Sequence, residues 1–266
     1  MTENVARYQA VIEYDGADFL GFQRQAQGLL RTVQGEVEAA LGRIGWAGKA
    51  VLGAGRTDTG VHAAGQVIAF DFDWPHGDDD LQRALNANLP ADVAVKSLAV
   101  CAPDFHPRFR ARGRRYRYTI YNAPMRSPLA ARYAWHVWPP ALNVEAMQTA
   151  SRPLIGRHDF AAFGTDPEAG NSTVRTVSVA EWSRAAGDRL TFDIQADAFL
   201  YRMVRSLVGA LKRVGAGDLT SAEFEAILES RDRARCPPLA PPQGLCLMEV
   251  LYGLGSTDRA DFTDWK

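Results

Sequence analysis

The stretch Gly53-Ala54-Gly55-Arg56-Thr57-Asp58-Thr59-Gly60-Val61-His62-Ala63 organises the rest of this chain. Its glycines add backbone freedom, and its Asp and Thr side chains tend to hydrogen-bond their own backbone, so it is predicted to form a loop. Short apolar runs rich in β-branched residues flank the loop and predict two strands. A loop mounted on two strands, with the Asp58 carboxylate between Arg56 and His62, is a common place for chemistry.

Outward from that loop, short strands and amphipathic helices follow one another without strict alternation. Hairpin-like strand pairs favour an α+β fold with mainly antiparallel sheets. Asp78 or Asp79 is expected to cap the second helix. We predict strands at 6–14, 93–100, 115–121, 174–185, 189–197 and 245–251, and helices at 33–44, 79–89, 144–155, 199–214 and 221–229.

Length and composition predict a two-part protein. The 266 residues are enough for two domains. We expect an N-terminal half, 1–104, that carries the loop 53–63, a C-terminal half, 105–252, and a polar tail, 253–266. The three cysteines are scattered, which indicates reduced thiols. There is no signal-peptide pattern and no apolar run near the ~20 residues of a membrane helix, so a cytoplasmic protein is expected.

Charge is concentrated in one segment although the net charge of the chain is only −1. Residues 105–132 hold eight arginines and no Asp, Glu or Lys. Phe105, Phe109, Tyr116 and Tyr118 are interleaved with these arginines. Arginines for phosphates beside aromatic rings for stacking are typical of RNA recognition. The alternatives are a solvated basic face and, for Tyr118, a core position, which we favour for that residue.

Several catalytic and binding templates fail. The third glycine of a dinucleotide-binding loop would fall at Asp58, and the chain has neither a Walker phosphate loop nor a metal-type cysteine or histidine spacing. Asp58 is either a reacting group or a turn residue that accepts backbone hydrogen bonds. Arg56 is expected to pair with Asp58, and His62 to be packed or hydrogen-bonded. Arg205 either extends to water or, if buried, pairs with a carboxylate such as Asp58.

The residues 55–63 resemble the signature of the tRNA pseudouridine synthase A family. Thr59 stands where that family usually has Ala, and Phe22 where it usually has Trp. Further blocks that resemble the family, in chain order, are 12–16, 21–25, 31–35, 86–90, 105–109, 115–118, 158–160, 198–205 and 240–245.

This resemblance implies a pseudouridine synthase fold with an active-site cleft between two α/β halves. It implies a cofactor-free isomerase, without a metal, that converts uridine to pseudouridine at positions 38–40 in the anticodon arm of tRNA. Asp58 matches the catalytic aspartate, Tyr116 the tyrosine that packs on the target base, Arg205 the arginine that pairs with the aspartate, and Arg56 a residue that contacts RNA. The loop glycines would let a flipped nucleotide approach closely.

The resemblance also implies a homodimer that binds tRNA across both subunits. RNA contacts are expected from Arg24, Arg108, Arg110 and Arg112. Whether Asp58 acts as nucleophile or base is left open. Two other function classes stay open on the residues alone: a non-catalytic RNA-binding module, and a hydrolase that uses Asp58 and His62, with or without a metal.

Overall fold

A computed structural model describes residues 5–25, 30–166 and 170–253. The predicted tail therefore lies outside the described residues, apart from Gly253. The chain forms two compact units. Unit 1 combines residues 1–112 with the C-terminal residues from 247 onward, and unit 2 is the continuous stretch 113–246.

The unit boundary lies after Arg112, beyond the predicted boundary at 104. The Phe105 side chain is buried, its ring centroid lies 5.4 Å from that of Tyr252, and its carbonyl accepts a hydrogen bond from Arg7 at 3.0 Å. The Arg112 N–H donates to the Leu251 carbonyl at 2.7 Å. These contacts attach residues 105–112 to unit 1, and the arginine-rich segment is divided between the two units.

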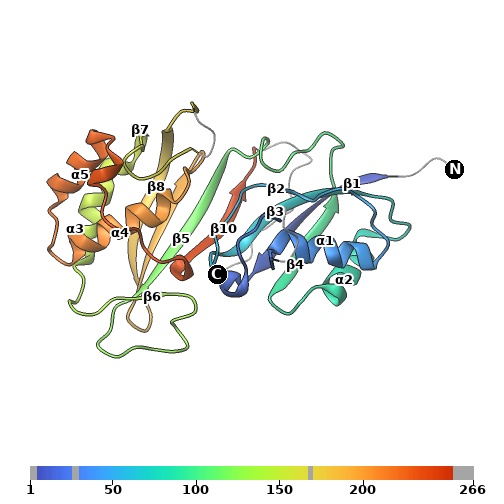
Figure 1. The fold of residues 1–266 in the computed structure, drawn as a ribbon, viewed down its shortest axis with the longest axis horizontal. Coiled ribbons are helices and arrows are strands. Elements are labelled where there is room, and N and C mark those ends of the chain that lie inside the picture. Colours follow the sequence, from blue (N-terminus) through green and yellow to red (C-terminus); the bar gives the residue numbers. More distant parts are fainter. Residues whose placement is uncertain (1–4, 26–29, 167–169, 254–266) are drawn as a thin grey trace. The chain divides into compact units, whose positions relative to one another are not determined.

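The sheet of unit 1 has the strand order β4-β1-β3-β10, with the short β2 paired to β3 (Figure 1). β1 is antiparallel to both β3 and β4. Burial alternates along β1, as its predicted strand pattern requires. The strands are β1 (Ala6–Tyr14), β2 (Leu52–Gly53), β3 (His62–Phe72), β4 (Val93–Val100) and β10 (Leu245–Leu251), the last belonging to unit 1 from Leu247 on.

The helix α1 (Val33–Arg43) begins where the sequence predicts. The Thr32 hydroxyl accepts a hydrogen bond from the Gly35 N–H at 3.3 Å, which satisfies one of the free amides at the helix start. Val37 and Leu41 are buried on its apolar face. A short 3-10 turn, Gly16–Asp18, follows β1.

The helix α2 (Asp78–Asn88) corrects the predicted cap. Its N-cap is Gly77, without a side-chain cap, rather than Asp78 or Asp79. The Asp78 carboxylate instead accepts a hydrogen bond from the Val100 N–H at 3.1 Å. Both aspartates lie in the first turn, where negative charge still complements the helix dipole.

Unit 2 has the strand order β5-β9-β8-β7, antiparallel throughout, with the two-residue β6 parallel to β5. The whole is the predicted α+β fold. β6 and β7 were not predicted, because two and four residues carry too little alternation. The elements are β5 (Gly113–Tyr121), β6 (Trp135–His136), α3 (Val144–Ser151), β7 (Gly156–Asp159), β8 (Val174–Ala185), β9 (Arg189–Ala196), α4 (Met203–Gly215) and α5 (Ser221–Ser230); 3-10 turns lie at Arg152–Leu154, Arg233–Arg235 and Pro242–Gly244.

The helix α4 begins at Met203, whereas the sequence predicts a start at Phe199. The Tyr201 N–H donates to the Thr165 carbonyl at 2.9 Å, which holds this part of the chain in an extended bridge. Arg202 then adopts a left-handed conformation with φ 62°, and the helix follows. A tertiary contact therefore overrides the apolar periodicity before Met203.

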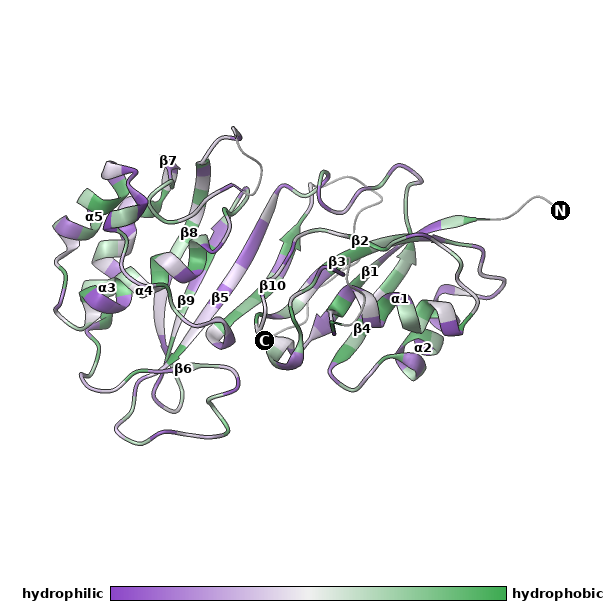
Figure 2. Ribbon diagram, viewed as in Figure 1, coloured by the Kyte–Doolittle hydropathy of each residue, from purple (hydrophilic) through white to green (hydrophobic). Residues whose placement is uncertain are grey.

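The apolar core is concentrated on the strands and on the inner faces of the helices (Figure 2). In the same view β5 carries a hydrophilic stretch, which contains Arg114, Arg115 and Arg117. Tyr118 on that strand is fully buried, as predicted. Within the described parts of the chain, no helix combines the length and apolarity that crossing a membrane requires.

A close approach between two strands of unit 1 depends on Gly65. A Cβ atom at Gly65 in β3 would lie 2.3 Å from the Met248 carbonyl oxygen of β10. At Gly42, on the exposed side of α1, a Cβ would meet nothing within 4 Å. The two glycines form a matched pair, one required by packing and one not.

We expect Gly65→Ala to lower the free energy of unfolding by about 2 kcal/mol, because β10 must move away from β3. Gly42→Ala should raise it by up to about 1 kcal/mol, because alanine favours a helix. Urea denaturation with a common m value measures both. An unchanged midpoint for Gly65→Ala would show that the two strands are not closely packed there.

Candidate active site

The loop that carries Asp58 is fastened to β3 at several points. The Ala54 N–H donates to a β3 carbonyl at 2.8 Å, and the Gln66 side-chain amide donates to the Gly55 carbonyl at 2.9 Å. The Val61 N–H donates to the Asp58 carbonyl at 3.1 Å and closes a turn. Asp58 is half-buried at the start of this turn. Gln66 was not identified from the sequence, because a buried amide in a strand has no distinct pattern.

The glycines of the loop serve different purposes. A Cβ at Gly53 would lie 2.5 Å from the Phe22 ring, whereas a Cβ at Gly55 would meet nothing within 4 Å. The expectation that these glycines leave room for a nucleotide therefore fails at Gly53, where the space is filled by a side chain of this protein. At Gly55 the backbone is open.

A second segment, which follows β1, covers the loop. The Phe22 N–H donates to the Thr57 carbonyl at 3.1 Å, and the Gly60 N–H donates to the Phe19 carbonyl at 3.3 Å. The hydroxyls of Tyr14 and Thr57 are buried and hydrogen-bonded at 2.8 Å. Thr57 is thus held through both its backbone and its side chain. These contacts fix the backbone position just before Asp58, the predicted catalytic aspartate.

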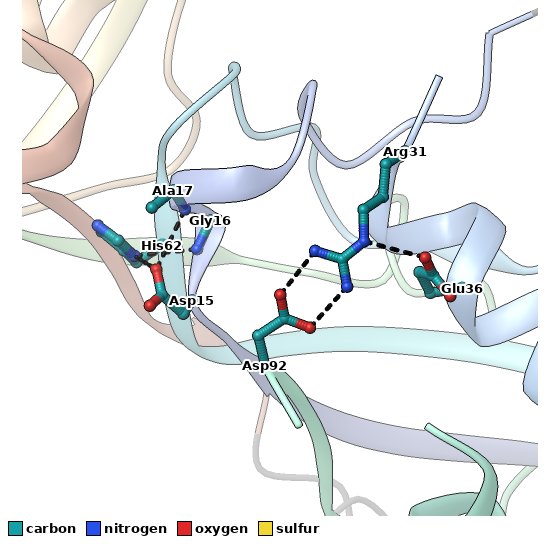
Figure 3. Close-up of polar contacts among 7 residues, drawn as sticks. All are labelled: Asp15, Gly16, Ala17, Arg31, Glu36, His62 and Asp92. Carbon is teal, nitrogen blue, oxygen red and sulfur yellow. Dashed lines mark hydrogen bonds and ion pairs between the residues drawn. The ribbon is translucent and has the colours of Figure 1, made fainter. Parts of the chain in front are cut away.

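His62 has the packed, hydrogen-bonded place that was predicted for it. Its side chain is buried, and its Nδ1 accepts a hydrogen bond from the Gly16 N–H at 3.0 Å (Figure 3). Asp15 Oδ1 lies 3.1 Å from the same Nδ1 and accepts a hydrogen bond from the Ala17 N–H at 3.1 Å.

The Arg56 side chain is exposed, and its ion pair with Asp58 remains a prediction. An exposed pair would gain little, because water screens the charges and both side chains would lose rotamer freedom. The Arg56 guanidinium is therefore presented at the surface beside the loop.

Arg24, a predicted RNA contact, is tied to α1. Its Nη1 lies 2.9 Å from Oε2 of Glu38, a buried carboxylate, and its N–H donates to the Gln34 side chain at 2.9 Å. Glu38 Oε1 in turn accepts a hydrogen bond from the Val51 N–H at 3.0 Å, just before β2. Arg24 therefore balances a buried charge, and its contact with RNA remains a prediction.

In unit 2, Tyr116 and Tyr118 lie on the same face of β5 but differ in burial. Tyr116 is half-buried, and its ring meets the ring of Phe199 edge-on, with centroids 5.0 Å apart. Tyr118 is fully buried and its hydroxyl donates to the Pro241 carbonyl at 2.8 Å. Burial raises the pKa of the Tyr118 hydroxyl. Tyr116 is thus the tyrosine that a ligand could contact.

Arg205 is held by a proline-rich strap, residues 236–242, that was predicted only to be extended. Its Nε donates to the Ala240 carbonyl at 2.8 Å, and its own carbonyl accepts a hydrogen bond from the Ala240 N–H at 2.9 Å. A Cβ at Gly209, one turn further along α4, would lie 2.2 Å from the Pro238 carbonyl oxygen. The strap therefore lies directly against the helix and orients the guanidinium.

The arginine-rich segment exposes one aromatic ring and buries another. Phe109 is 77% exposed, with the His106 ring centroid at 4.2 Å and the Arg108 guanidinium at 5.9 Å from its ring. Phe105, expected to take part in stacking, is buried in unit 1 and is a core residue instead. A pattern of aromatics between arginines cannot distinguish these two cases.

The positive charge of this segment is partly balanced by acids from outside it. Arg110 pairs with Asp104, and the Arg117 guanidinium donates to Asp193 of β9 at 3.0 Å. Acids outside the segment thus offset part of its charge, and the Arg117–Asp193 pair joins neighbouring strands that lie far apart in the sequence. Arg112 is exposed.

No described group of three or more His, Cys, Asp or Glu side chains is arranged to hold a metal ion.

The predicted site residues fall into two sets. Tyr116 and Arg205 belong to unit 2. Unit 1 contains Arg24, Arg56, Asp58, Arg108, Arg110 and Arg112.

Comparison with known proteins identifies the family. A family model described as tRNA pseudouridine synthase matches residues 10–110 and 150–253. The chain belongs to this family. The matched stretches include Asp58 and Arg205, whereas Tyr116 falls between them.

Relatives that bear the name tRNA pseudouridine synthase A align over nearly their whole length. The protein of Methylobacterium sp. (strain 4-46) is 45% identical over 247 residues, which cover 92% of this chain and 97% of its own. That of Syntrophotalea carbinolica is 43% identical over 242 residues, or 91% and 94%. That of Neisseria gonorrhoeae is 40% identical over 267 residues, or 99% of each chain.

We predict that Tyr14→Phe lowers the free energy of unfolding by about 1 kcal/mol, because the Thr57 hydroxyl loses a buried partner. Amide hydrogen exchange over residues 53–61 should rise at the same time. Tyr8→Phe, on the same strand, is the control, because the Tyr8 ring packs on Phe70 away from this loop. Equal exchange in the two variants would show that the hydroxyl pair does not hold the loop.

Proposed function

We propose that this protein isomerises uridine to pseudouridine in tRNA. The observation that carries the proposal is family membership over most of the chain, together with a half-buried aspartate at the position of the family signature. The substrate is a tRNA, and the product is the same tRNA with one rearranged nucleoside. On the resemblance, we propose that the target uridines lie at positions 38–40, in the anticodon arm.

The reaction breaks the glycosidic bond from N1 to C1′ and forms a carbon–carbon bond from C5 to C1′. N1 gains a proton and C5 loses one, so the formula of the nucleoside is unchanged. A base stacked in a helix cannot be rotated in this way, so the nucleotide must first be flipped out into a pocket. The chemistry needs neither an oxidant nor a reductant, and we propose that the enzyme uses no cofactor.

We propose Asp58 as the catalytic residue. A carboxylate can add to the sugar or the ring as a nucleophile and leave again, or it can remove a proton from the sugar. Both roles require that the carboxylate stay in one place while the base turns. The bonds to Thr57 and the turn closed by Val61 support this role, because they restrict the backbone on both sides of Asp58.

We propose that Tyr116 stacks on the flipped base and that Arg205 keeps Asp58 ionised. The edge-on contact with Phe199 supports the first role, because it holds the Tyr116 ring at a fixed angle. The bond from Arg205 Nε to Ala240 supports the second, because it orients the other guanidinium donors. Arg56 is proposed to contact the target nucleotide.

We propose that the exposed group formed by Arg108, Phe109 and Arg112 binds the tRNA backbone, with weaker contributions from Arg24 and Arg110. Arg24 and Arg110 already pair with Glu38 and Asp104, so their positive charges are partly neutralised. The enzyme is further proposed to be a cytoplasmic homodimer. Light scattering of the purified protein would measure its mass in solution and test the dimer.

Asp58→Asn and Asp58→Ala are expected to abolish pseudouridine formation while the affinity for tRNA is kept, because only the reacting carboxylate is changed. The measurement is the release of tritium from tRNA labelled at uridine C5, with EDTA present and no metal added. Asp79→Asn is the matched control, since Asp79 is an exposed carboxylate on α2. Turnover by either Asp58 variant would overturn the assignment.

The same assay separates the alternative functions. A non-catalytic RNA-binding module would bind tRNA and release no tritium even when protein is in excess. A hydrolase that uses Asp58 and His62 with a metal would lose activity in EDTA and would leave a shortened or base-free RNA. Tritium release in EDTA with intact tRNA supports the isomerase alone.

The variant with Arg108, Arg110 and Arg112 all changed to Gln should bind tRNA more weakly. Its slope of log affinity against log salt concentration should be shallower by up to about three, because each arginine that neutralises a phosphate releases about one counterion. Filter binding at several salt concentrations measures the slope. The control changes Arg184, Arg189 and Arg213, which are exposed in unit 2, to Gln and removes the same charge. Equal slopes for the two triple variants would exclude residues 108–112 as the docking surface.

A further inference from the structure

Arg31, for which the sequence suggested no role, links three separate segments of unit 1. It precedes the cap of α1, and its guanidinium donates two parallel hydrogen bonds to the Asp92 carboxylate, at 2.7 and 2.9 Å (Figure 3). Its Nε donates to Glu36 of α1 at 3.1 Å. The hydrogen bonds to Asp92 raise the pKa of Arg31, so the charge is kept.

Arg31 also holds the segment that covers the Asp58 loop. The guanidinium carbon lies 4.2 Å from the centroid of the Phe19 ring, which is 1% exposed. The Leu20 N–H donates to the Arg31 carbonyl at 2.9 Å. The Arg31 side chain thus contacts Phe19, and the Arg31 backbone binds Leu20, the next residue of that segment.

Two routes lead from this arginine to the residues that follow Asp58. The first route runs through Phe19, whose carbonyl accepts a hydrogen bond from the Gly60 N–H at 3.3 Å. The second starts at Asp92, whose carbonyl accepts a hydrogen bond from the Asp15 N–H at 3.0 Å. The Asp15 carboxylate lies 3.1 Å from Nδ1 of His62, the first residue of β3.

We infer that Arg31 is a positioning residue for Asp58, and that its bidentate pair with Asp92 is the element that fixes the loop. This inference rests on the proposed function of Asp58. The Arg31 and Asp92 side chains are 36% and 22% exposed, so water only partly screens their interaction. A planar guanidinium can make two parallel bonds and stack on a ring at once, which a lysine ammonium cannot.

Glu36 provides the matched control. It binds the same guanidinium, but it lies on α1 and on neither route to the loop. Arg31→Lys keeps the charge and removes the two-pronged bond, and Asp92→Asn weakens the pair from the other side. Glu36→Gln removes a charge of the same sign as Asp92 without breaking the Arg31–Asp92 pair.

The experiment measures the single-turnover rate of tritium release with enzyme in saturating excess over tRNA, the Kd for tRNA, and amide exchange over residues 57–62. Arg31→Lys and Asp92→Asn should each slow the reaction by roughly tenfold or more, with Kd changed by less than about twofold and exchange increased. Glu36→Gln should leave all three near wild type. The double variant should be no slower than the slower single variant, since both changes break one interaction.

Other outcomes overturn the inference. A weaker Kd with an unchanged rate would mean that Arg31 contacts tRNA rather than positioning Asp58. A lower unfolding midpoint with unchanged rate and exchange would mean that the pair only stabilises the fold. If wild-type protein releases no tritium, the proposed function itself fails; the exchange comparison still decides whether Arg31 and Asp92 hold the loop.

Discussion

The buried hydrogen bond between the hydroxyls of Tyr14 and Thr57 is the direct contact between β1 and the candidate site, and the position of Thr57 depends on it. It joins the end of a central strand to the middle of a loop that β3 and the segment around Phe19 also hold. Glycine-rich loops lose much conformational entropy on ordering. Here that cost is met by bonds from β3 on one side and from the segment around Phe19 on the other. The Asp58 carboxylate thus has a fixed backbone position without being fully buried.

Unit 2 solves a comparable problem by different means. Arg205 lies near the start of α4, and its long side chain has many rotamers. The proline-rich strap restrains this side chain through the hydrogen bond from Nε to Ala240. Prolines keep residues 237–241 extended, and an extended segment offers carbonyls that no helix or sheet has used. The Tyr116 ring is restrained by its edge-on contact with the Phe199 ring. Each unit thus orients its own candidate site residues with local contacts.

Most of the fold could be predicted, and the reasons for the exceptions are physical. Period-two burial in β1 and the Thr32 cap of α1 are local features, so the sequence contains them. The start of α4 depends on a bridge to Thr165, and the burial of Phe105 depends on Tyr252; both are contacts between distant residues. For the site, the loop and its aspartate could be recognised. The supports at Gln66, Arg31 and Ala240 could not, because their partners are backbone groups or residues far along the chain.

The path of the chain has a consequence for biosynthesis. Unit 1 includes residues 247 onward, so its sheet gains β10 only after all of unit 2 has been made. Unit 2 is continuous from 113 to 246, and all of its residues leave the ribosome earlier. Domains generally fold as units during synthesis. The unit that contains Asp58 therefore completes its folding last, and a chain that stops before β10 leaves an edge of β3 without its neighbouring strand.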